Sequence, residues 1–243
     1  MIVRMKKQIH RAKDRGQAEH GWLHTHYSFS FADWYEPSRM GFGSLRVLND
    51  DLIDPSSGFD AHAHRDMEII TIVLKGTLTH RDNMGNVGTI PAGDVQVMSA
   101  GTGVMHSEHN DSATERLELF QIWIETKDRG IEPRYEQKSF GNTSIKNVIQ
   151  PLVVSDMTLE PTEALTIHQD ASISRVLLEP DHSIEYKLAS ESHGVYVFVI
   201  EGQIEVDGVQ FDRRDAVGVF ETQRLFISTK TNAEILLIEV PMS

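Results

Sequence analysis

The chain has 243 residues, enough for one large or two modest domains that each bury a core. It contains no cysteine, which excludes disulfides, leaves only nitrogen and oxygen atoms as metal ligands, and makes a reducing cytoplasm the expected location. The net charge of -13 argues against direct binding to nucleic acid, and the longest aliphatic runs are too short to span a membrane.

Short aliphatic and alternating runs recur along the whole chain and predict β-strands. These runs cover residues 44–49, 67–74, 117–125, 173–179, 195–200, 203–206 and 235–240. Turn residues separate them, including Asp207-Gly208, a dipeptide that tight two-residue hairpins prefer. Because long segments with helical periodicity are hard to find, helices should be few and short, and the predicted class is an all-β sandwich or barrel.

The polar stretch 125–146 contains glycine and proline and lacks sustained alternation, which indicates a crossing between two domains. We therefore expect an N-terminal domain at residues 1–130 and a C-terminal domain at residues 131–243. Each half also contains a strand that ends in glycine, at 69–76 and 195–202, followed by a second strand and a turn. This shared pattern suggests a duplicated fold, with chance similarity between hairpins as the alternative.

Two pairs of potential metal ligands have the same spacing. His62 and His64 are two positions apart before a strong predicted strand, so both imidazoles project to the same side of an extended segment. About 40 residues later, His106 and Glu108 repeat this spacing. If the segments are neighbours inside a barrel, three imidazoles and one carboxylate meet at one divalent ion and leave positions open for chemistry. The alternative to a metal site is that these are ordinary surface histidines, and the repetition of the paired spacing argues against it.

The motifs around these residues resemble those of the cupins. Residues 58–76 follow the pattern Gly-x3-His-x-His-x3-Glu-x7-Gly, and residues 85–93 match the start of the second cupin motif. Where cupins usually place their last histidine this chain has Gln96, and the displacement of the ligands to His106 and Glu108 resembles the pirins. Further similarity to pirins lies in His20-Gly-Trp22, Ser28-Phe-Ser-Phe31, Gly41-Phe-Gly43, residues 45–50 and Pro133-Arg-Tyr135. The resemblance covers nearly the whole chain and is greatest to bacterial pirins described as quercetin 2,3-dioxygenases.

This resemblance implies a bicupin, two jelly-roll-like β-barrels of which the first holds the metal. It implies that His62, His64, His106 and Glu108 are the metal ligands and the catalytic residues, with Fe(II) the expected ion and Mn, Co, Ni, Cu and Zn as alternatives. It further implies that O2 cleaves the heterocyclic ring of flavonols such as quercetin with release of CO. Glu108 would accept the proton of the substrate hydroxyl. Glu68 is a ligand in many other cupins. Here it is expected to hold the tautomer of a liganding histidine from behind or to line the pocket, with a structural salt bridge as the alternative.

A second function also fits the resemblance, namely a redox-responsive metal-binding partner of regulatory proteins or metabolic enzymes. A cupin isomerase or epimerase is a weaker third hypothesis, because the motif region lacks an independent acid/base pair. A bicupin that supplies its own second barrel is compatible with a monomer.

Other histidines and glycines have simpler interpretations. The C-terminal barrel is expected to hold no metal, because its histidines show no paired spacing. Aromatic and histidine residues at 20–27 predict a packed strand that caps the first barrel, with a second metal site as the alternative. Gly101 and Gly103 are expected to form a tight turn that lets His106 approach the metal.

Overall fold

The computed structural model describes residues 5–141, 145–159 and 162–243, and nearly all of its regular structure is β-strand. The predicted all-β class is confirmed. Within these residues the only helix is the short 3-10 turn η1 (Ala12–Asp14). None of the described elements is a helix with the length and apolar character needed to cross a membrane.

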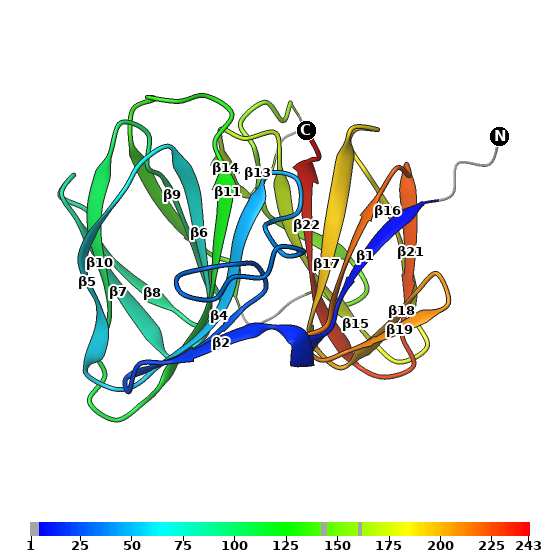
Figure 1. Cartoon of the computed structure of the whole chain (residues 1–243), viewed down its shortest axis with the longest axis horizontal. Coiled ribbons are helices and arrows are strands. Elements are labelled where there is room, and N and C mark those ends of the chain that lie inside the picture. The colour runs from blue at the N-terminus through cyan, green and yellow to red at the C-terminus, as the bar shows by residue number, and fades with distance from the viewer. Residues whose placement is uncertain (1–4, 142–144, 160–161) are drawn as a thin grey trace.

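The N-terminal domain consists of a large and a small antiparallel sheet (Figure 1). The large sheet has the order β12-β9-β6-β11-β4-β3-β2. Its strands are β2 (Gly16–Glu19), β3 (Leu23–Tyr27), β4 (Leu45–Ile53), β6 (Met67–Lys75), β9 (Asp94–Ser99), β11 (Leu117–Glu125) and β12 (Arg134–Ser139). The small sheet has the order β5-β10-β7-β8 and contains β5 (Ser57–His64), β7 (Thr77–Asp82), β8 (Val87–Pro91) and β10 (Val104–Asn110).

The C-terminal domain is built in the same way. Its large sheet has the order β1-β20-β17-β22-β15-β13-β14. The strands of this sheet are β1 (Lys6–His10), β13 (Ile149–Ser155), β14 (Leu165–Ile167), β15 (Ser172–Leu178), β17 (His193–Glu201), β20 (Ala216–Phe220) and β22 (Ala233–Pro241). The small sheet, in the order β16-β21-β18-β19, contains β16 (Ser183–Lys187), β18 (Gln203–Val206), β19 (Val209–Asp212) and β21 (Arg224–Ser228).

The two domains share one topology, which supports the predicted duplication. In the large sheets, β9, β6, β11 and β4 correspond in order to β20, β17, β22 and β15. In the small sheets, β5, β10, β7 and β8 correspond to β16, β21, β18 and β19. Because the order of four strands repeats in both sheets, chance similarity between two hairpins does not explain the pattern.

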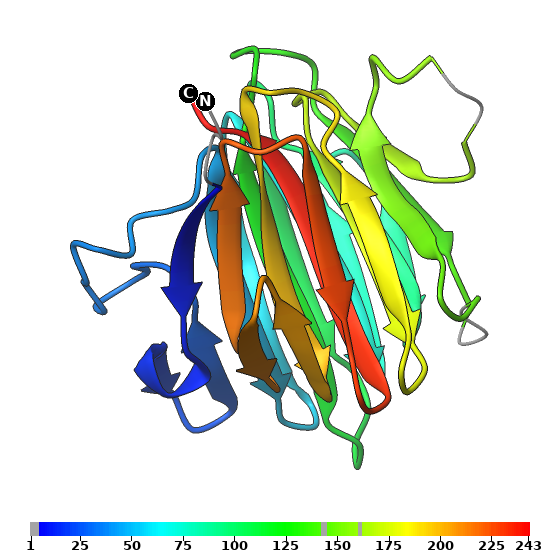
Figure 2. The ribbon, with the colours of Figure 1, turned by 90° about the vertical axis from the view of Figure 1, so that its right-hand side faces the viewer.

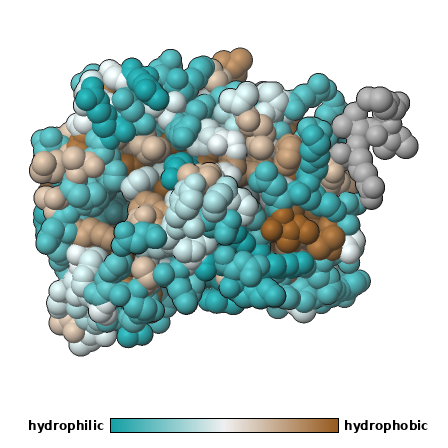
Figure 3. All heavy atoms as spheres, viewed as in Figure 1, coloured by the Kyte–Doolittle hydropathy of each residue, from teal (hydrophilic) through white to brown (hydrophobic). Residues whose placement is uncertain are grey.

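The largest hydrophobic core lies between the two large sheets, which face each other in the middle of the molecule (Figure 1). From the N-terminal side it contains Ile70, Ile72 and Phe120, and from the C-terminal side Phe198 and Leu236. Strand alternation explains this placement, since Ile70 and Ile72 share one face of β6 while Ile69 and Thr71 point into the N-terminal barrel. The outer surface in Figure 3 is mostly hydrophilic, with a compact hydrophobic patch over the C-terminal domain.

Edge strands connect the halves of the chain. Strand β1, from the very start of the described chain, pairs with β20 of the C-terminal domain and lies beside it in Figure 2. Strand β12 falls inside the polar stretch 125–146, where we expected a domain crossing, yet it pairs with β9 of the N-terminal domain. Its residues 134–139 are polar and only partly buried, so the alternation that reveals other strands is weak there.

Candidate metal centre

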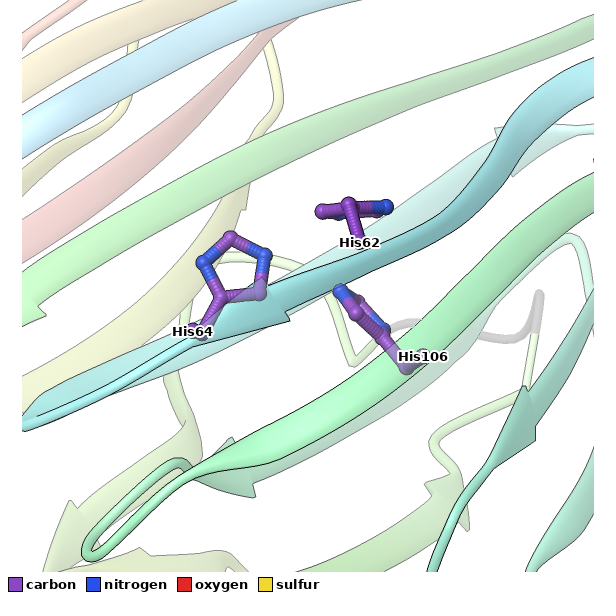
Figure 4. A group of neighbouring side chains, drawn as sticks. All are labelled: His62, His64 and His106. Atoms are coloured by element: carbon purple, nitrogen blue, oxygen red, sulfur yellow. The ribbon is translucent and has the colours of Figure 1, made fainter.

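Three of the four predicted ligands converge on one point. Strands β5 and β10 pair antiparallel, and the register places His62 directly opposite His106. With His64 two residues further along β5, the three imidazoles face one another (Figure 4). Their ring centroids are 4.5 to 4.9 Å apart. One nitrogen from each ring lies within 4.8 Å of the other two, a spacing at which a single metal ion can be held.

Glu108 lies in the same pocket but belongs to a second, overlapping group. Strand β10 keeps its alternation, so His106 and Glu108 project to the same side, whereas the register shift between the two strands adds a residue to β5. The carboxylate lies within 4.8 Å of ring nitrogens of His106 and of a residue that the sequence analysis missed, His80 on β7. It is buried and accepts hydrogen bonds from Gln96 Nε2 (3.0 Å) and from Gln121 Nε2. The amide that replaces the usual cupin histidine therefore orients Glu108.

Hydrogen bonds to the outer ring nitrogens leave the inner ones free for a metal. The Nδ1–H of His62 can donate to the backbone carbonyl of Asp60 (2.8 Å), which leaves Nε2 with its lone pair. His106 Nδ1 lies 3.5 Å from Nδ1 of His80, whose Nε2 is 3.1 Å from Oδ2 of Asp82. Nε2 of His106 is buried and has no hydrogen-bond partner among the described residues. A metal ion would pair this atom, so the donor set fits such a group.

The electrostatics of the cluster favour neutral imidazoles. Burial, followed by the positive potential of His62, lowers the pKa of His64 to about 4. Burial and the neighbouring histidines lower the pKa of His106 to about 3. Both rings are therefore unprotonated at neutral pH, as metal ligands must be. Burial raises the pKa of Glu108, which makes this carboxylate more basic than an exposed glutamate.

A cavity of about 180 Å³ opens beside the three histidines. Aromatic side chains from β3, β5 and β11 and from the loop after β3 form much of its wall, namely Tyr27, Phe31, Phe59 and Trp123. Polar side chains on β4 and β11 complete it, namely Asn49, Asp51 and Gln121. Sequence analysis missed these polar residues. Their signal is present in the sequence, because Asn49 and Asp51 alternate with Leu48 and Asp50 along a strand whose other inward positions are apolar.

The expectation for Glu68 is wrong. Its side chain is fully buried, but it lies on the face of β6 that carries Ile70 and Ile72 toward the other domain. There it accepts a hydrogen bond from Ser99 Oγ (2.6 Å) and one from the backbone N–H of His168 in the C-terminal domain (3.2 Å). Glu68 therefore lies away from the metal ligands, forms no salt bridge with any described residue, and connects the two domains.

Glycines and aromatic residues near the site lie as expected. Gly101 and Gly103 have positive φ angles of 47° and 141° in the turn between β9 and β10, directly before the strand that carries His106. Trp22 packs edge-on against Phe59 at 5.1 Å between ring centroids, so the residues around it pack against the first barrel.

The corresponding positions of the C-terminal domain carry different chemistry. Matching the two domains through Gly76 and Gly202, and then through the strand registers, gives the following equivalents for His62, His64, His106 and Glu108: Tyr186, Leu188, Leu225 and Ile227. Tyr186, Leu225 and Ile227 belong to a buried hydrophobic cluster. An apolar core therefore fills the space that the pocket occupies in the N-terminal domain.

The paired small and large sheets, together with the histidine cluster in the first barrel, define a bicupin with a candidate metal site. A family model for Pirin matches residues 8–124, and a model described as the quercetinase C-terminal cupin domain matches residues 152–240. The chain is 42% identical over 233 residues to a quercetin 2,3-dioxygenase of Escherichia coli, covering 96% of this chain and 98% of that one. It is 42% identical over 226 residues to a pirin-like protein of Caulobacter vibrioides, covering 92% and 95%.

Solved structures agree with this assignment. The crystal structure of YhhW from Escherichia coli matches with a TM-score of 0.92 and 40% identity, covering 98% of this chain and 99% of that one. A crystal structure of the same bacterial pirin in complex with nickel(II) matches with a TM-score of 0.91 and 40% identity, covering 98% and 100%. The chain belongs to the pirin family.

Proposed function

We propose that this protein is a metal-dependent dioxygenase that cleaves the heterocyclic ring of flavonols such as quercetin with O2 and releases CO. The observation that carries the proposal is the convergence of three imidazoles beside a carboxylate and a partly aromatic pocket. The relative from Escherichia coli that bears the name quercetin 2,3-dioxygenase matches almost the whole chain, which supports this substrate class.

His62, His64, His106 and Glu108 would hold one divalent ion, for which we propose iron. Nitrogen and oxygen donors accept most first-row metals, and the nickel(II) complex of the Escherichia coli pirin shows that this family can bind another ion. The C-terminal domain would hold none, since the equivalent positions are occupied by Leu, Ile and Tyr side chains. The metal-dependent reaction would then take place in the N-terminal domain, residues 1–130.

When bound, the metal would lower the pKa of a coordinated flavonol hydroxyl. Glu108 is then the natural acceptor of that proton, because burial raises its pKa and it lies in the pocket wall. Gln96 and Gln121 donate hydrogen bonds to its two oxygens and hold the carboxylate in place. Tyr27, Phe31 and Phe59 supply apolar surface on which a flat aromatic substrate can pack and from which water is displaced.

The decisive experiment combines elemental analysis of the purified protein with a quercetin assay that follows O2 uptake and CO release. The variant His106→Ala should lose both the metal and the turnover. His109→Ala is a matched control, because His109 lies on the same strand but faces Asp60 outside the cluster. Full metal content without any metal-dependent quercetin turnover would contradict the dioxygenase and favour the redox-responsive partner.

A further inference from the structure

The pocket wall beside the histidines contains polar atoms to which the proposed chemistry gives no partner. Asn49 lies on β4, and Gln121 and Trp123 lie on the adjacent strand β11, in direct register with β4. Asn49 and Gln121 are only 5% and 7% exposed, although both line the cavity. We call these three residues the polar wall.

Each residue of the polar wall has a buried polar atom without a hydrogen-bond partner in the described part of the chain. These atoms are Oδ1 of Asn49, Oε1 of Gln121 and Nε1 of Trp123. The orientation of Gln121 follows from chemistry, since its Nε2 must donate to the Glu108 carboxylate and Oε1 is then the free end. An unpaired buried polar group destabilises the folded protein, so three of them in one wall are candidates for pairing with a ligand.

The donors and acceptors define the complementary ligand. Two carbonyl oxygens require O–H or N–H donors, whereas the indole N–H of Trp123 requires an acceptor. A phenolic hydroxyl can serve either kind of partner. The cavity of about 180 Å³ is also smaller than the roughly 300–1,000 Å³ of typical ligand pockets, so it encloses part of a flavonol rather than the whole.

We infer that the polar wall binds ring hydroxyl groups of the substrate and selects polyhydroxylated flavonols over those that carry only the 3-hydroxyl. This inference rests on the proposed function and specifies its substrate class. Asn49 and Gln121 accept hydrogen bonds from hydroxyls of the enclosed ring, and Trp123 donates one. The three residues line the pocket next to the histidine cluster, since Trp123 packs edge-on against His64 at 4.9 Å between ring centroids and Gln121 donates a hydrogen bond to Glu108.

The test compares flavonols that differ only in hydroxylation. 3-Hydroxyflavone has no further hydroxyl, galangin adds two on one ring, and quercetin adds two more on the other ring. We expect the wild-type protein to prefer a hydroxylated flavonol in kcat/KM by about tenfold for each hydrogen bond of about 1.4 kcal/mol. Asn49→Leu and Trp123→Phe should each reduce the ratio of kcat/KM for that flavonol to kcat/KM for 3-hydroxyflavone by about tenfold.

Binding to metal-free protein provides a readout that does not depend on turnover. Quenching of tryptophan fluorescence should report binding, and Asn49→Leu should weaken binding of the hydroxylated flavonol about tenfold relative to 3-hydroxyflavone. The exposed Thr89 on β8 supplies the control, since Thr89→Val should leave that ratio unchanged. If the protein turns over no flavonol but this binding preference exists, the proposed function fails and the inference stands.

Thermal unfolding separates a binding role from a structural one. Asn49→Leu replaces an amide whose oxygen is buried and unpaired, so the melting temperature of the metal-free protein should stay the same or rise. Equal treatment of all three flavonols by wild type, in both turnover and binding, would overturn the inference. So would a variant that weakens binding of 3-hydroxyflavone as much as that of quercetin.

Discussion

Asp51 is a buried carboxyl group in the pocket, where it is 4% exposed. Burial raises its pKa from 3.8 to about 7, and the charges of Asp50 and Glu108 add to the rise. In the unfolded chain the same carboxyl ionises near its ordinary value. The folded state therefore retains a proton that the unfolded state has lost over the range from about pH 4 to pH 7.

This difference predicts how stability depends on pH. As pH rises from about 4 to 7, the carboxyl of Asp51 makes the folded state progressively less stable, by up to about 4 kcal/mol in total. Asp51→Asn removes the ionisable group, so its stability gain over wild type should grow between pH 5 and pH 7 and level off above pH 7. Urea unfolding of both metal-free proteins measures this gain. A gain of equal size at pH 5 and pH 8 would contradict the assigned burial.

His80 is predicted to position His106 for metal binding. Its ring lies between Nδ1 of His106 and the carboxylate of Asp82, and it stacks on Tyr135 at 4.5 Å between centroids. His80→Phe keeps an aromatic ring but removes both polar contacts, which should weaken metal affinity by about 10- to 100-fold. Titration with nickel(II) against a competing chelator measures the affinity.

Tyr135→Phe provides the matched control for this prediction, because it preserves the stacked ring and removes only a hydroxyl that donates to Gln137. Its nickel(II) affinity should equal that of wild type. The idea that His80 orients His106 would be wrong if His80→Phe bound nickel(II) as tightly as this control.

For single residues, the sequence predicted the positions of side chains whose spacing repeats. It failed for side chains whose contacts depend on which strands become neighbours. His62, His64 and His106 meet as expected because both pairs obey strand alternation. His80 and Gln121 could not be assigned, since their contacts with Glu108 and His106 depend on which strands become neighbours. Glu68 was misplaced because its motif position identified a role but not which face of β6 it occupies.

Among the elements, strands with apolar alternation and turns with glycine were predictable. Asp207-Gly208 joins β18 to β19 with positive φ at both residues, 49° and 73°, as the hairpin prediction required. Strand β12 was not predictable, because a polar edge strand pairs through its backbone and leaves little pattern in its side chains.

Two glycines at strand turns should differ in their cost on substitution. Gly208→Ala imposes only the strain of a positive φ, because no atom of the described residues lies within 4 Å of the added Cβ, and should destabilise by about 1 kcal/mol. Gly76→Ala has a similar φ of 77° but also places Cβ 2.7 Å from the backbone oxygen of Arg116. Urea unfolding should therefore show a clearly larger loss for Gly76→Ala, and equal losses would contradict the close approach at Gly76.

In the whole molecule, buried contacts join the two domains. Phe120 and Phe198 meet edge to face across the interface at 5.3 Å between centroids. Asp50 of the N-terminal domain forms buried ion pairs with Arg15 (3.1 Å) and with Arg214 of the C-terminal domain (2.8 Å). Breaking such a pair leaves an unpaired buried charge, so separation of the domains should be costly. The sequence predicted two domains, but it contained no signal for this contact, because strands such as β6 and β17 carry apolar side chains on both faces.

The hydrophobic core between the two large sheets is shared by both domains, so we predict that the domains unfold together. A ligand that binds only the folded state stabilises whatever unfolds with its site, by about 2.7 kcal/mol at 100 times its dissociation constant. Nickel(II) at the N-terminal histidines should therefore slow hydrogen exchange of the most protected amides of β17 and β22 in the C-terminal domain. Calorimetry of the metal-free protein should likewise show one transition, which moves as a whole when metal is added. Slower exchange restricted to β6, β10 and β11 would show that the N-terminal domain unfolds alone.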